Sequence, residues 1–159
     1  LSNFDTSKVT DMSAMFYGSK VTSLDLSNFD TSKVTDMSDM FSGSKATTLD
    51  VSNFDTSKVT DMSAMFYGSK VTSLDLSNFD TSKVTDMSAM FYGCPNLTTV
   101  YVGNKFITDK VSSSTNMFTN STKLVGGAGT VYNSSYIDKT YARVDGGTSS
   151  PGYFTFKTN

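Results

Sequence analysis

The sequence predicts an α/β solenoid, a stack of about five coils that each contain one short parallel strand and one short helical segment, closed by a small C-terminal β cap. The motif SNFDTSKVTDMSAMF starts nearly unchanged at four positions that are 25 residues apart: Ser2, Ser27, Ser52 and Ser77. A fixed period of this length is typical of proteins whose units bury a core only by stacking. Within each repeat, a stretch that alternates apolar and polar residues precedes a stretch with helix-like apolar spacing.

The strand of each coil is predicted by period-two alternation. In the coil at residues 21–45, Leu24 and Leu26 alternate with polar residues, which indicates one buried face. An asparagine follows this stretch in every repeat, and we expect the column to be buried and to hydrogen-bond the backbone of successive coils, because buried backbone groups need partners. The column consists of Asn3, Asn28, Asn53 and Asn78.

The helical segment is predicted by four apolar residues at spacing i, i+3, i+6 and i+7, which places them on one inward face. They are Val34, Met37, Met40 and Phe41. The side-chain oxygens of residues 30–32 are placed to cap the first turn, and Gly43 is placed to end the last one.

The predicted repeat array covers residues 1–123, and the predicted cap covers residues 124–159. The fifth coil is degenerate after a one-residue insertion around Pro95, as terminal repeats often are. After Leu124 the composition shifts to Gly, Tyr, Ser and Thr, with glycine-rich turn signals between strand-like runs. These runs predict strands at 129–133, 140–145 and 153–157.

The composition argues against an enzyme. The chain has no His, Glu, Gln or Trp and a single arginine, Arg143, so most acid–base and metal-ligating side chains are missing and no cofactor is expected. Residues 1–100 carry twelve Asp and seven Lys, and they lack the basic stripe that nucleic acid or an anionic membrane would require. No apolar run is long enough for membrane insertion. Cys94, the only cysteine, is expected to be a small core residue.

The exposed side of the strands is the first candidate interaction surface. Stacking in register places three aspartates in a column that continues into an aromatic residue: Asp25, Asp50, Asp75 and Tyr101. Carboxylates about 4.8 Å apart repel one another, so something must offset their charge. Solvent and neighbouring lysines are one possibility, and a basic protein segment or Ca²⁺ is the alternative.

The second candidate surface is a tyrosine column that follows the helical segments. It contains Tyr17, Tyr67 and Tyr92, and Ser42 interrupts it. Exposed tyrosines could bind protein or sugar rings, because each gives a large contact area with a polar tip. Half-buried packing between coils is the alternative.

The unit LDLSNFDTSKVTDMSAMFYGS, with GCPNL at Gly93–Leu97, resembles the repeat of the BspA-like leucine-rich-repeat surface proteins and lipoproteins of bacteria. The tail TYARVDGGTSSPGYF at Thr140–Phe154 resembles the segment that often follows such arrays. The resemblance implies a leucine-rich-repeat-like fold and an extracellular module at the bacterial cell surface. It also implies a protein or glycan partner on host or neighbouring cells, and it transfers no catalytic residues.

Two functions are therefore carried forward. The first is a non-catalytic adhesion or interaction module that binds a macromolecular partner through the regular solenoid surface, and the alternative is a passive stalk that presents another domain. The near-identical coils offer little individuality, so we expect specificity in the fifth coil and the tail. Leu1 aligns with Leu26, so we expect the chain to begin inside a repeat. The first coil should then expose an apolar edge that permits end-to-end self-association, formed by Phe4, Val9, Met12, Met15 and Phe16.

Overall fold

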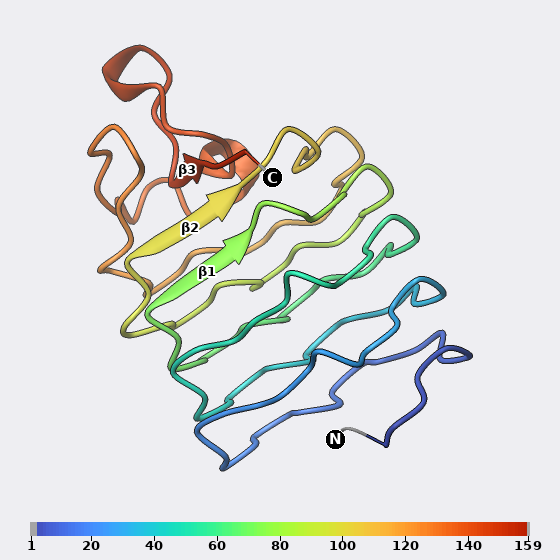
Figure 1. The fold of residues 1–159 in the computed structure, drawn as a ribbon. Coiled ribbons are helices and arrows are strands. Elements are labelled where there is room, and N and C mark those ends of the chain that lie inside the picture. Colours follow the sequence, from blue (N-terminus) through green and yellow to red (C-terminus); the bar gives the residue numbers. More distant parts are fainter. Residues whose placement is uncertain (1–2, 159) are drawn as a thin grey trace.

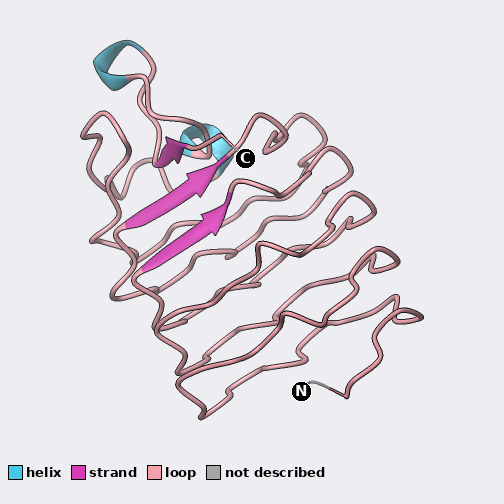
Figure 2. Cartoon of the chain, viewed as in Figure 1, coloured by secondary structure: helices cyan, strands magenta, loops and turns pink. Residues whose placement is uncertain are grey.

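The chain winds as a stack of coils that rises from the N-terminal end to a looped C-terminal segment (Figure 1). This computed structural model describes residues 3–158, so the expectation for Leu1 lies outside the described residues. Loops and turns make up almost all of the chain (Figure 2). The regular elements are β1 (Ser73–Leu76), β2 (Thr99–Val102), the 3₁₀ helices η1 (Lys139–Tyr141) and η2 (Gly147–Ser149), and β3 (Phe154–Phe156).

The predicted α/β solenoid is wrong. Between residues 3 and 158 the structure contains no α-helix, and its only strands are the three short ones of a single parallel sheet. The helical segment predicted for every coil is replaced by a run of turns, and the strand predicted for every coil forms only in the last two. The absence of the helix follows from the directions in which the backbone amides donate.

Amides in the segment predicted as helical donate in two alternating directions. The amide of Met15 donates back to the carbonyl of Met12 at 3.3 Å, and the amide of Tyr17 donates back to Ala14 at 3.0 Å. The amide of Ala14, between them, donates sideways to the carbonyl of Ser38 in the next coil at 2.8 Å. An α-helix directs all of its amides along its own axis, so sideways donation excludes it.

Left-handed residues separate these turns. Ala14 has φ 53° and Gly18 has φ 63°, and the same conformation recurs in the next coils at Asp39 and Gly43. A left-handed residue interrupts a right-handed helix. The conformational strain of such a residue must be offset by its contacts within the stack. Successive turns still bring the chain back to the interior about every third residue, so the predicted inward residues are all fully buried. These are Val34, Met37, Met40 and Phe41.

A ladder of phenylalanine rings runs through the core along the stack. Neighbouring rings are nearly parallel, with centroids 5.5–5.8 Å apart. The ladder consists of Phe16, Phe41, Phe66, Phe91 and Phe118. Full burial of one such ring stabilises the fold by roughly 1.5–3 kcal/mol, so the ladder is a major part of the adhesion between coils.

Buried threonine side chains link adjacent coils by hydrogen bonds. The buried hydroxyl of Thr31 donates to the carbonyl of Asp55 at 3.0 Å and accepts from the amide of the same residue at 2.8 Å. Thr6 and Thr56 repeat this contact one coil before and one coil after. The sequence predicts that Thr31 caps a helix, whereas its hydroxyl bonds the backbone of the next coil.

Two members of the asparagine column, Asn53 and Asn78, bond successive coils as predicted, but the column is not buried. The exposed Asn53 donates to the carbonyls of Leu26 and Phe29, both at 3.0 Å, and Asn78 makes the equivalent bonds one coil later. The Leu26 carbonyl therefore accepts from a side chain of the next coil and from the backbone amide of Phe29, the latter at 3.0 Å.

The sheet joins the last coils to the C-terminal segment. β1 pairs with β2 and β2 pairs with β3, all in parallel, so that Asp75 lies beside Tyr101 and Tyr101 lies beside Thr155. β3 occupies the position at which the strand of a further coil would stand (Figure 1).

The C-terminal segment packs on the last coil through aromatic side chains, but it is not the β-rich cap that was predicted. Of the three predicted strands only the last forms, as β3, and η1 begins just before the second. The buried ring of Tyr153 contacts that of Phe118 edge-on at 5.0 Å, and Phe154 contacts Phe118 at 5.9 Å. No helix within residues 3–158 has the length and apolarity that a membrane span requires.

Candidate functional site

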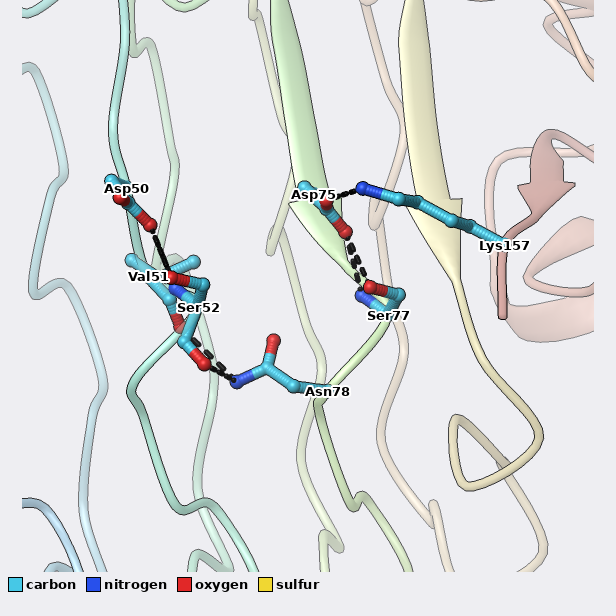
Figure 3. Close-up of polar contacts among 7 residues, drawn as sticks. All are labelled: Asp50, Val51, Ser52, Asp75, Ser77, Asn78 and Lys157. Atoms are coloured by element: carbon cyan, nitrogen blue, oxygen red, sulfur yellow. Dashed lines mark hydrogen bonds and ion pairs between the residues drawn. The ribbon is translucent and has the colours of Figure 1, made fainter. Parts of the chain in front are cut away.

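The aspartate column stands on the sheet side of the stack, where Asp75 is part of β1. Asp25 and Asp50 are exposed, whereas Asp75 is half-buried on β1 beside Tyr101. Each carboxylate accepts hydrogen bonds from the serine two residues further along. Asp50 accepts from the amide of Ser52 at 3.0 Å and from its hydroxyl at 2.6 Å (Figure 3).

These serine contacts offset the repulsion that the sequence analysis expected. The side-chain and backbone hydrogen bonds from Ser27 lower the pKa of Asp25, and those from Ser52 lower the pKa of Asp50. The carboxylates are thereby kept ionised by groups of their own coil. An external basic partner is not needed to stabilise the column.

Lys157 closes the column at its C-terminal end. Its ammonium group pairs with Asp75 (Figure 3) and lies 5.9 Å from the centre of the Tyr101 ring. Burial raises the pKa of Asp75, but the hydrogen bonds from Lys157 and Ser77 outweigh this effect and lower it. The tail of the chain therefore supplies the counter-charge.

The calcium alternative finds no site in the part of the chain that the structure describes. Across residues 3–158, no three aspartate or cysteine side chains gather into a group that could hold a metal ion. The arrangement explains this result, because each carboxylate of the column turns one oxygen towards its own serine. Ca²⁺ takes six to eight converging oxygens.

The tyrosine column is present but discontinuous. Tyr67 and Tyr92 stack face to face, with ring centroids 4.8 Å apart and planes 6° apart. Tyr17 is separated from them by the buried Ser42 and is 66% exposed. The aspartates belong to the sheet side of each coil and the tyrosines to the run of turns, so the two predicted columns form separate surfaces.

Exposed apolar side chains are frequent in the C-terminal segment. The sequence predicts only that this segment, together with the fifth coil, differs from the near-identical repeats. Of the nine large apolar side chains found exposed in the described residues, five lie beyond residue 124. They are Val125, Val131, Tyr136, Val144 and Phe156. The C-terminal segment therefore exposes more large apolar side chains than the coils do.

A hollow of about 300 Å³ lies where the three strands end. Ser77 and Gly103 follow β1 and β2, and Lys157 follows β3, so the ends of three parallel strands meet around it. Lys105 and Asn104 add a charge and an amide. We call this hollow the strand-end hollow.

A second hollow, of about 340 Å³, lies within the C-terminal segment. It is formed by the loops at 128–133 and 147–151, with Tyr141 between them. We call it the tail pocket. No sequence motif indicated it, although the glycines at positions 126, 127, 129, 146 and 147 marked the loops that form it.

The described residues thus define a repeat protein built of stacked coils, with hollows at its C-terminal end. The chain belongs to the family described as "Mycoplasma protein of unknown function, DUF285", which matches residues 1–101 and again residues 46–142. No curated protein and no solved structure matches it.

Proposed function

We propose that this chain is a non-catalytic recognition module of a bacterial surface protein. The stacked coils form the support, and the fifth coil and C-terminal segment bind a protein or glycan on host or neighbouring cells. The observation that carries the proposal is the gathering of both hollows and most of the exposed apolar side chains at that end of the stack. Specific binding depends on a few distinct anchors, and this end of the chain offers them.

The surface of the coils supports the assignment of binding to the C-terminal end of the stack. Its aspartates are engaged by serines of the same coil, and its asparagines by the backbone of the preceding coil. Side chains that already serve the stack have little left for a partner. The regular solenoid surface is accordingly the weaker candidate for the binding face.

The location and the partner class rest on sequence resemblance. The repeat unit and the tail TYARVDGGTSSPGYF resemble BspA-like leucine-rich-repeat surface proteins and lipoproteins, which implies an extracellular adhesion module. The family match is compatible with this reading and is silent on the ligand.

The test uses the 159-residue chain, immobilised and incubated with extracellular-matrix proteins and with a glycan array. Val131→Asp places a charge on the C-terminal segment, and Tyr17→Asp is its matched control, because the two residues are 65% and 66% exposed. We expect saturable binding that Val131→Asp weakens at least about tenfold, a loss of about 1.4 kcal/mol. Tyr17→Asp should leave it unchanged. The reverse result would place binding on the coil surface.

A passive stalk is the second candidate, and the continuous phenylalanine ladder favours it by making the coils one stiff body. Clean negatives across both panels would support the stalk and contradict a recognition module.

A further inference from the structure

The tail pocket is held in shape by a buried carboxylate. Asp145 accepts hydrogen bonds from the amides of Ala128, Thr130 and Gly147, each at 2.9 Å, and from the hydroxyl of Thr130 at 2.7 Å. These donors come from both loops of the pocket. One side chain therefore fixes the two walls relative to each other, and its own charge is fully used in doing so.

Glycines bring the same loops into close contact. A side chain at Gly126 would collide with the carbonyl oxygen of Gly152, and one at Gly152 would collide with the carbonyl of Arg143. Gly147 has φ 72°, in the left-handed region that favours glycine. The pocket is thus formed by specific backbone geometry before any ligand arrives, which lowers the entropic cost of binding.

An aromatic wall closes one side. Tyr141 lines the pocket and stacks on Tyr136 with ring centroids 4.3 Å apart and planes 5° apart. Tyr153 supports it edge-on at 5.1 Å. Because its neighbours hold the ring in place, Tyr141 offers a rigid surface at little entropic cost.

The remaining lining is uncharged and mixes apolar residues, such as Val131 and Pro151, with a few polar ones. Thr148 offers a hydroxyl, and Asn133 offers its amide nitrogen, since its amide oxygen already accepts from the amide of Ser135 at 2.9 Å. No charged side chain is among the residues that line the pocket. A ligand with a net charge would therefore lose its hydration without gaining a counter-charge.

From these features we infer that the tail pocket binds one neutral pyranose ring of a glycan. A pyranose presents an apolar face suited to Tyr141 and a hydroxyl rim suited to Thr148 and Asn133. The volume of about 340 Å³ lies near the lower end of the roughly 300–1,000 Å³ range of small-ligand sites. This inference deepens the proposed function and rests on it, because it names the ligand class for that end of the stack.

The test is ligand-observed NMR with the 159-residue chain. The probes are the methyl glycosides of glucose, galactose, mannose and N-acetylglucosamine, with N-acetylneuraminic acid as an anionic arm and a proline-rich peptide as a protein-like arm. Thr148→Arg fills the pocket, Thr148→Val removes only the hydroxyl, and Thr122→Arg is the matched control, because Thr122 is exposed and lines neither hollow.

We expect at least one neutral glycoside to bind. Thr148→Arg should abolish its signal, Thr148→Val should weaken it several-fold, and Thr122→Arg should preserve it. All three variants should unfold at the temperature of the parent chain, since these threonines are exposed.

Binding of the anionic sugar or the peptide alone would overturn the inference, as would glycoside binding that survives Thr148→Arg. If no sugar binds while a matrix protein still does so in a Val131-dependent manner, the inference fails and the proposed function stands. If neither binds, both fail.

Discussion

Lys157 pairs with Asp75 across the whole width of the sheet, although 82 residues separate them in the sequence. β3 carries Lys157 beyond its neighbour β2, over the ring of Tyr101, to reach a carboxylate on β1. The contact fastens the end of the chain to β1, a strand with which β3 does not pair directly. It also neutralises the innermost member of the aspartate column.

Removing this ion pair should cost little. The side chains of Lys157 and Asp75 are 50% and 41% exposed, and water screens such pairs strongly. We expect Lys157→Met to lower the melting temperature by about 3 °C at most. The difference should disappear in 1 M salt, where the Debye length falls to about 3 Å. Calorimetry in low and high salt measures both effects. A larger loss that persists in 1 M salt would contradict the view that this contact is a screened surface ion pair.

Met62→Asp should disrupt the stack. Met62 is fully buried in the column of core methionines, where a carboxylate would find neither a counter-charge nor water. We expect a loss of about 4 kcal/mol or more, measured by urea denaturation. Lys58→Asp is the control, because Lys58 is exposed in the same coil. Equal stability of the two variants would contradict the inward position of Met62.

Side-chain direction could be predicted from the sequence better than backbone conformation. The spacing of Val34, Met37 and Met40 correctly placed them inside, because a position that stays apolar at every repeat must be buried in the stack. The same spacing suits a helix and a run of turns, so it could not distinguish them. The left-handed backbone at Ala14 and Asp39 produces turns instead of a helix. Neither alanine nor aspartate indicates this conformation in a sequence as glycine does.

The candidate site was predicted only in part. The period aligned the aspartates and tyrosines, because stacking converts a repeat into columns. It could not foresee that Lys157 would reach Asp75, since the tail lacks a repeat from which to align it. The tail pocket depends on hydrogen bonds that Asp145 accepts from Ala128 and Thr130, which lie 17 and 15 residues away in the sequence. Composition does not predict a contact of this kind.

The C-terminal segment should lose stability in acid through Asp145. Burial raises the pKa of this carboxyl, but the hydrogen bonds from Thr130, Gly147 and Ala128 prevail and lower it to about 2 from an ordinary 3.8. A lowered pKa stabilises the folded state above the unfolded value and ceases to do so as the pH falls through the folded value. We expect tyrosine fluorescence to report loosening between about pH 4 and pH 2.

Asp145→Asn is the control for that titration. The amide cannot ionise, and its nitrogen cannot accept the bonds that Asp145 accepts from Ala128 and Thr130, so the segment should be loosened already at pH 7. Its fluorescence should then change little between pH 4 and pH 2. A variant with the same acid transition as the parent would assign that transition to another group.

Cys94 should resist thiol reagents in the native protein. Burial raises the pKa of its thiol to about 11, and its Sγ donates to the carbonyl of Phe66 at 3.0 Å. The thiolate that reacts is therefore scarce and covered at pH 8. We expect labelling by a disulfide reagent only after urea is added. Rapid labelling without denaturant would show that the coil opens locally.

The Cys94 thiol also affects stability at high pH. Because its pKa is raised on folding, this group stabilises the protein below about pH 9 and ceases to do so as the pH rises towards 11.

The first coil of the 159-residue chain should fray or associate more readily than the third. Phe4 is 53% exposed, and Val9, Met15 and Phe16 are half-covered, although Met12 is buried, contrary to the sequence-based expectation.

The backbone at this end is also less engaged. Carbonyls of the second coil, such as that of Ser38, accept amides from the first, whereas no described residue donates in this way to the equivalent Ser13. Hydrogen exchange should therefore be faster at residues 10–18 than at residues 60–68, and light scattering should rise with protein concentration. Phe4→Lys should suppress association without changing the exchange of the third coil. A monomer at every concentration whose first coil is protected as well as its third would show that this edge is stable without a neighbour.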